Sequence, residues 1–110
     1  MKYLITESQL NKAIFRYLNN QDFIPIEEGN NIYFVNSEGD EYAQIRFDKK
    51  DGWCYIYYRL IKEISSFFSL DKTEAEQVIG KWVENTLQIR VVFTSREFLS
   101  GYDELRIPSN

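Results

Sequence analysis

Apolar residues recur at helical spacing near the start of the chain, at Leu10, Ala13, Ile14, Tyr17 and Leu18. Intervals of three and four residues place these side chains on one face of a helix. The preceding Thr-Glu-Ser-Gln run is a capping box, in which the Thr6 hydroxyl accepts from the amide of Gln9 and the Gln9 side chain reaches back. Asn19 and Asn20 end the run. The pattern predicts a first helix between Thr6 and Asn19.

Alternating apolar and polar positions replace the helical spacing in the middle of the chain. They cover residues 32–35, 41–47 and 53–59. Polar turns separate these runs, and Gly39 and Gly52 stand where the last residue of a hairpin loop needs a positive φ. The pattern predicts a three-stranded antiparallel meander. A shorter run at residues 23–26 contains Pro25, which cannot donate a ladder hydrogen bond and therefore favours an edge strand.

Helical spacing then returns in two consecutive segments. The first segment should end near Ser69, and its apolar positions are Leu60, Ile61, Ile64, Phe67 and Phe68. In the second segment Asp71 and Glu74 form another capping box. The apolar face of this third helix consists of Ala75, Val78, Ile79, Trp82 and Val83.

The last part of the chain alternates once more over residues 87–93, which predicts a final strand with Leu87, Ile89, Val91 and Phe93 on one side. Thr94 or Ser95 can cap one short helical turn that Gly101 would end, and we expect a frayed tail beyond about residue 103.

The order of these elements predicts a single α+β domain over residues 1–110. Its antiparallel sheet should have three to five strands, with the meander in the middle of the chain and two to three helices packed mainly on one face. We expect the first and third helices on the face that carries Ala43, Ile45, Cys54 and Ile56.

Composition supports a folded domain and restricts its chemistry. Hydrophobic residues make up 44% of the 110 positions, and the net charge of −4 repels phosphate backbones and anionic lipid. The chain has no histidine, which removes imidazole as catalyst and metal ligand. Cys54 is the only cysteine, so no intramolecular disulfide can form. We therefore expect a non-enzymatic protein with no cofactor and no metal.

Two further features bear on chemistry and location. The acidic groups around Glu27 and Asp40 lack the ligand spacing of a calcium loop and are interpreted as hairpin ends. The first ten residues lack the apolar core of a signal peptide, and no run approaches the length of a membrane span. These observations favour a cytoplasmic protein without a membrane partner.

The most unusual feature is the aromatic content of 16%, concentrated around residues 53–58. Alternation puts aliphatic residues of the second and third meander strands on one face, so the opposite face should be aromatic and arginine-rich. It would contain Tyr42, Gln44, Arg46, Trp53, Tyr55, Tyr57 and Arg59.

Three explanations for this face remain open. Helices and the last strand of the same chain can cover it, so that the rings are ordinary core. It can bind a protein, either a second copy in a homodimer or another partner, because Trp, Tyr and Arg are enriched at interfaces. It can also stack single-stranded nucleic acid or a small planar ligand, although the acidic background opposes nucleic acid. A histidine-free enzyme that uses carboxylates would instead need a deep pocket with paired acids.

Two segments, residues 2–10 (KYLITESQL) and 68–87 (FSLDKTEAEQVIGKWVENTL), resemble short uncharacterised proteins of marine bacteriophages and related marine metagenomic sequences. The resemblance implies a context, which is the cytoplasm of an infected bacterium, and an accessory or structural role. It supplies no catalytic residues.

Overall fold

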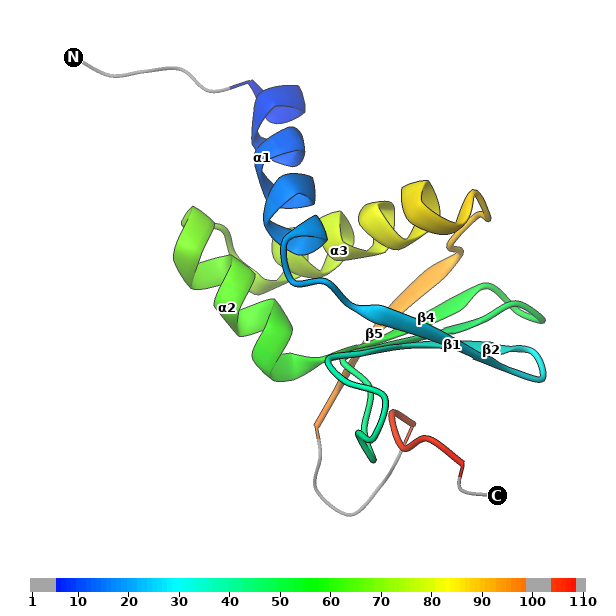
Figure 1. Cartoon of the computed structure of the whole chain (residues 1–110). Helices are drawn as coiled ribbons and strands as arrows, with labels where there is room; N and C mark the ends of the chain where they lie inside the picture. The colour runs from blue at the N-terminus through cyan, green and yellow to red at the C-terminus, as the bar shows by residue number, and fades with distance from the viewer. Residues whose placement is uncertain (1–5, 99–103, 109–110) are drawn as a thin grey trace.

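The computed structural model describes residues 6–98 and 104–108, in which three helices lie on one side of a five-stranded sheet (Figure 1). The fold is α+β, as the sequence predicts. The helices are α1 (Glu7–Asn19), α2 (Tyr58–Phe68) and α3 (Lys72–Leu87). The strands are β1 (Ile24–Glu28), β2 (Asn31–Val35), β3 (Ile45–Asp48), β4 (Trp53–Tyr57) and β5 (Phe93–Glu97). No helix of the described part is long and apolar enough to cross a bilayer.

The strand order is the chain order, β1-β2-β3-β4-β5, and the first four strands form an antiparallel meander. Pro25 lies in the edge strand β1, as predicted. The fifth strand pairs with β4 in parallel, with Trp53 opposite Phe93. Because α2 and α3 carry the chain back across the sheet, β5 starts at the same end as β4.

Local caps fix the helix starts. The Thr6 hydroxyl accepts from the Gln9 amide at 3.1 Å, and Asp71 accepts from the Glu74 amide at 2.7 Å. Both capping boxes are complete, because each third-position side chain also accepts from the amide of its cap residue. The first and third helices are therefore confirmed with the caps that the sequence indicates.

The predicted strand over residues 87–93 is wrong. Helix α3 continues to Leu87 and ends at Gln88, whose φ of 57° is left-handed, and the strand begins only at Phe93. Thr94 and Ser95, expected to cap a short helix, are residues of this strand. Gly101, the expected helix stop, lies outside the described residues.

Strand β5 lacks the apolar alternation of the other strands, because its side chains on the helix side are polar. On the helix side of β5, the Thr94 hydroxyl donates to a Glu76 carboxylate oxygen at 2.5 Å, and the Arg96 Nε donates to the other oxygen at 2.7 Å. Arg96 also donates to the Thr73 hydroxyl at 2.9 Å. The edge strand β5 thus contacts α3 through these hydrogen bonds, whereas β2, β3 and β4 carry apolar side chains on the helix side.

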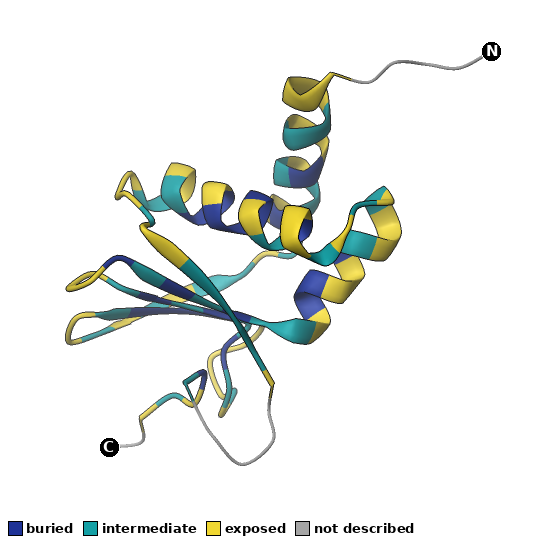
Figure 2. Cartoon of the chain, turned by 180° about the vertical axis from the view of Figure 1, so that it is seen from behind, coloured by how far each residue is buried: buried dark blue, intermediate teal, exposed yellow. Residues whose placement is uncertain are grey.

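The main core lies between the helices and the sheet, where Figure 2 shows the buried side of α3 turned toward the strands. Its sheet residues are Ile32, Phe34, Ile45, Phe47, Cys54 and Ile56. Helix α2 adds Leu60, Ile61 and Ile64, so this face is covered by more than the two helices that we expected. Ala43 is a further correction: it packs on the opposite face with Tyr33 and Val35. The chain before Ile45 is not regular β-strand, so simple alternation does not extend back to Ala43.

Residues 104–108, where the sequence suggests a frayed tail, lie against the sheet on the side away from the helices (Figure 1). Leu105 is 1% exposed, and Ile107 packs on the cluster of Tyr33, Val35 and Ala43. The segment runs beside residues 41–43, with Tyr42 bridged to Arg106 in antiparallel register. The chain therefore covers part of its own outer sheet face.

Candidate interaction surface

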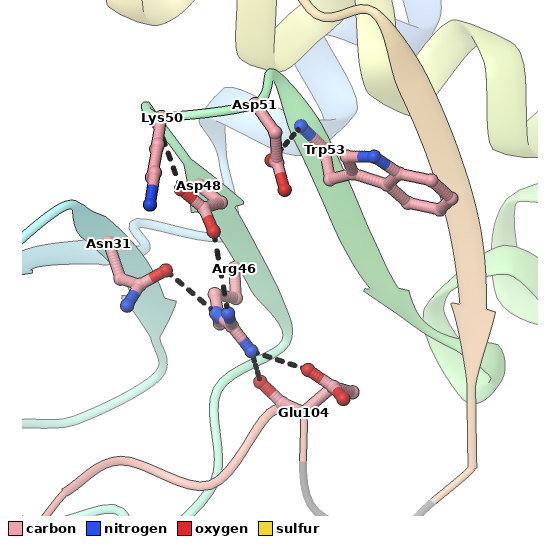
Figure 3. A network of polar contacts seen from close by, with 7 residues as sticks. All are labelled: Asn31, Arg46, Asp48, Lys50, Asp51, Trp53 and Glu104. Atoms are coloured by element: carbon pink, nitrogen blue, oxygen red, sulfur yellow. Dashed lines mark hydrogen bonds and ion pairs between the residues drawn. The ribbon is translucent and has the colours of Figure 1, made fainter.

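The predicted aromatic face is present where β3 and β4 lie side by side. Arg46 pairs with Tyr55, and Trp53 pairs with Asp48, while the residues between them are buried under the helices. Alternation along a strand therefore directs Arg46, Trp53 and Tyr55 to the outer face. The bond from the Trp53 amide to the Asp51 carboxylate, 3.0 Å long, fixes the start of β4 (Figure 3).

The other predicted residues lie elsewhere. Tyr42 and Gln44 precede β3, and Tyr42 forms the bridge to Arg106. Tyr57 ends β4 and is the N-cap residue of α2. Arg59 belongs to the first turn of α2 and is exposed, so its expected place on the strand face is wrong. The helix starts two residues before the point at which its apolar spacing begins, which the pattern could not reveal.

Arg46 makes several polar contacts within the chain (Figure 3). Its Nε donates to the Asn31 side-chain oxygen at 2.9 Å. Its Nη1 donates to the Glu104 carbonyl at 2.9 Å and to the Glu104 carboxylate at 2.7 Å. Nη2 lies 3.8 Å from Asp48, and the guanidinium carbon lies 4.6 Å from the centre of the Tyr55 ring. The positive charge that the sequence assigns to this face is thus compensated by two carboxylates.

The surroundings of Arg46 shift the pKa values of the two neighbouring tyrosine hydroxyls. Burial is the main reason that the pKa of the Tyr55 hydroxyl is raised, and the Glu104 carboxylate raises it further while Arg46 lowers it. Burial also raises the pKa of Tyr33, with Arg46 again acting in the opposite sense. Both hydroxyls are therefore neutral donors at physiological pH.

Three rings continue the face toward the edge of the sheet. The Trp53 ring stacks on Tyr55, with centres 6.0 Å apart, and contacts Phe93 of β5 at 5.0 Å. We call Trp53, Tyr55 and Phe93 the aromatic patch. Phe93 is 54% exposed, and Val92 beside it is 51% exposed.

Sequence reasoning missed the role of Phe93. The apolar spacing of residues 87–93 placed it in a different strand, without a pairing partner. Gly52 lies where the two strands meet, but its hairpin φ of 78° already accounts for a glycine in the sequence, so it gave no separate signal for β5. In the structure, a Cβ at this position would lie 2.6 Å from Val92 Cγ2, and the Val92 amide donates to the Gly52 carbonyl at 2.8 Å. Only a glycine lets β5 approach the start of β4 so closely.

Among residues 6–98 and 104–108 no charged residue is buried, including those that line the surface grooves. An open groove of about 560 Å³ runs between α3 and β5, beside Gly80, Lys81 and Glu84. A second groove between α1 and α3 has Glu7 and Glu74 on its walls. Glu74 closes the helix cap and the Glu7 side chain is 83% exposed, so neither carboxylate has the apolar surrounding that a catalytic acid needs.

The cysteine thiol and the acidic side chains also lack the surroundings of a reactive site. Cys54 is fully buried, and desolvation raises the pKa of its thiol, which confirms its interpretation as a small core residue. Among residues 6–98 and 104–108, no three acidic or cysteine side chains gather as metal ligands.

Comparison with known proteins identifies no relative: no family model, curated protein or solved structure matches the chain.

Proposed function

We propose that the chain is a non-enzymatic interaction domain that self-associates through the aromatic patch. The observation that supports this proposal most directly is the exposure of Phe93, on the last strand of the sheet and in contact with Trp53. Aromatic rings at the centre of an interface contribute much of its binding energy. Phe93 and Val92 together offer apolar surface that a monomer leaves in water.

A second copy is the partner that fits this surface best. The chain has a net charge of −4, so two copies repel on average. The aromatic patch carries no formal charge, and the adjoining Arg46 is compensated by Asp48 and Glu104. Two copies can therefore approach here with little repulsion. Since a stable dimer buries roughly 800 Å² per partner, the contact has to extend from the rings along the open edge of β5.

Nucleic acid has less support as a ligand of the same face. Stacking of bases on rings needs nearby cations that neutralise phosphates. Arg46 already binds Glu104 at 2.7 Å, and Arg59 lies in α2 rather than on the strand face. The acidic chain thus has aromatic rings on which bases could stack, but it lacks the positive charge nearby that would neutralise phosphates.

The marine-phage resemblance adds a proposed context, an accessory or structural role in the cytoplasm of an infected bacterium. A self-associating domain without catalytic groups is compatible with that role.

The test is the solution mass of the Phe93→Ser variant over a wide concentration range, by sedimentation or light scattering. We expect the wild type to form a dimer, with the variant dissociating at least about tenfold more readily because it loses a ring at the centre of the contact. Phe67→Ser is the matched control. Phe67 is 68% exposed, but it belongs to α2 and contacts Tyr17, away from the aromatic patch.

A monomeric wild type at every concentration would contradict the proposal. Equal weakening of the dimer by both substitutions would also contradict it, since general loss of exposed apolar surface would then explain the effect.

A further inference from the structure

A second surface of the molecule is occupied by the chain itself. Residues 104–108 lie beside residues 41–43, with a turn at 104–105 and an antiparallel bridge between Tyr42 and Arg106. The Ala43 amide donates to the Leu105 carbonyl, and the Ile107 amide donates to the Glu41 carbonyl, each at 2.8 Å. These two bonds flank the Tyr42–Arg106 bridge and attach the segment to the chain just before β3.

The side chains of the segment alternate between two kinds of contact. Leu105 is fully buried, and Ile107 packs on a cluster formed by Tyr33, Val35 and Ala43. Glu104 offers both its carbonyl and its carboxylate to the same Arg46 Nη1 atom. The surface thus takes an acid, a leucine and, two residues later, an isoleucine.

The acid-binding group is positioned without help from the segment (Figure 3). Asn31 of β2 accepts from Arg46 Nε, Asp48 of β3 lies near Nη2, and the Tyr55 ring of β4 lies beneath the guanidinium. These contacts hold Nη1 toward the outer face, where Glu104 reaches it. A guanidinium fixed in advance loses little entropy when a carboxylate binds.

We propose that this surface is a recognition site for a short protein segment with the sequence Glu-Leu-Arg-Ile, and that Glu104–Ile107 occupies it in cis. The site is built by residues between Ile24 and Tyr55, far from the segment in sequence. It holds the segment by two backbone hydrogen bonds, by the Arg46–Glu104 contacts and by apolar packing of Ile107. Of the residues named for this site, Tyr55 alone also belongs to the aromatic patch, and the peptide titration tests the site separately from self-association.

The tethered segment limits access to the site. Because the cis segment belongs to the same chain, its binding is intramolecular, and a free segment of equal affinity competes poorly. A partner would bind when its own segment is tighter or when the cis segment is displaced. The experiment therefore weakens the cis segment and supplies its sequence in trans.

The probe is a fluorescein-labelled peptide, Asp-Glu-Leu-Arg-Ile-Pro-Ser, titrated against the full-length Leu105→Ser variant with anisotropy as readout. We expect saturable binding, at least about tenfold tighter than to the wild type, whose site is filled. Two control peptides keep the protein constant. Replacing the peptide glutamate by glutamine should weaken binding about fivefold or more, and replacing its leucine by serine should abolish binding.

A folded variant that binds none of the peptides, or all three equally, would overturn the proposal. Hydrogen exchange of the wild type keeps the test decisive if Leu105→Ser unfolds. The Ala43 and Ile107 amides should exchange through a local opening, faster than the amides of the β3–β4 ladder. If they exchange only with global unfolding, the segment is an integral part of the fold and the site does not exist.

Discussion

At the residue scale, the Asp71 side chain both caps the start of helix α3 and makes the stability of the fold depend on pH. Its carboxylate accepts from the Glu74 amide at the start of α3. That backbone bond is the largest cause of the lowered pKa of Asp71, followed by the contact with the Glu74 side chain. A carboxyl whose native pKa lies below its unfolded pKa stabilises the fold above the unfolded value. The contribution is lost as pH falls through the native pKa.

Asp71→Asn should therefore leave stability near pH 7 almost unchanged, because asparagine is also a good cap. Between about pH 4 and pH 2 the wild type should lose stability more steeply than this variant. Urea unfolding at a series of pH values measures the difference. Asp71→Ala is the control, since it loses the cap and should be less stable than the wild type at neutral pH. Parallel pH curves for wild type and Asp71→Asn would refute the assignment.

At the scale of elements, the contact between α3 and β5 depends on a missing side chain. Gly80 is buried in the middle of α3, and a Cβ there would lie 2.8 Å from Thr94 Cγ2. The hydroxyl of Thr94 is held by Glu76, so the methyl group has little freedom to move away. Glycine is unfavourable inside a helix, and close packing against β5 is the reason for it here.

Gly80→Ala should lower the free energy of unfolding by about 1 kcal/mol, because the clash outweighs a helix-propensity gain of similar size. Combining it with Thr94→Ser removes the methyl group and keeps the hydroxyl. The double variant should then be more stable than Gly80→Ala, with a coupling of roughly 1 kcal/mol. Denaturant unfolding of the four proteins in this cycle measures the coupling. Additive effects would show that a Cβ at position 80 does not clash with the Thr94 methyl group.

At the scale of the whole molecule, net charge decides between the two proposed uses of the aromatic patch. Two copies with a charge of −4 each repel, and salt screens that repulsion. Binding of phosphates instead weakens as salt rises, because releasing condensed counterions into a more concentrated salt solution gains less entropy.

Self-association should therefore strengthen about two- to threefold between 20 and 300 mM salt, measured by sedimentation equilibrium. A single-stranded oligonucleotide that quenched Trp53 at low salt and dissociated at high salt would support the alternative. Trp82 serves as an internal control, because it is buried and donates to Asn19 at 2.9 Å.

The sequence by itself determined the first and third helices and the meander. Caps and periodicity act between residues three or four apart on a helix, or two apart on a strand, so their signals are local. The inward alternation of Ile45, Phe47, Cys54 and Ile56 also followed from this rule. The same rule directs Arg46, Trp53 and Tyr55 to the opposite face of the sheet.

Only the tertiary structure decided which side chains of the outer sheet face are free to contact a partner. Arg46 meets Glu104 fifty-eight positions away in sequence, and β5 pairs with β4 while Glu76 on α3 accepts from its Thr94 and Arg96 side chains. Neither contact leaves a periodic pattern, since single polar pairs between distant segments depend on where the chain returns. Within β3 and β4, local periodicity therefore determined which residues point outward, and long-range contacts determined which of them remain exposed.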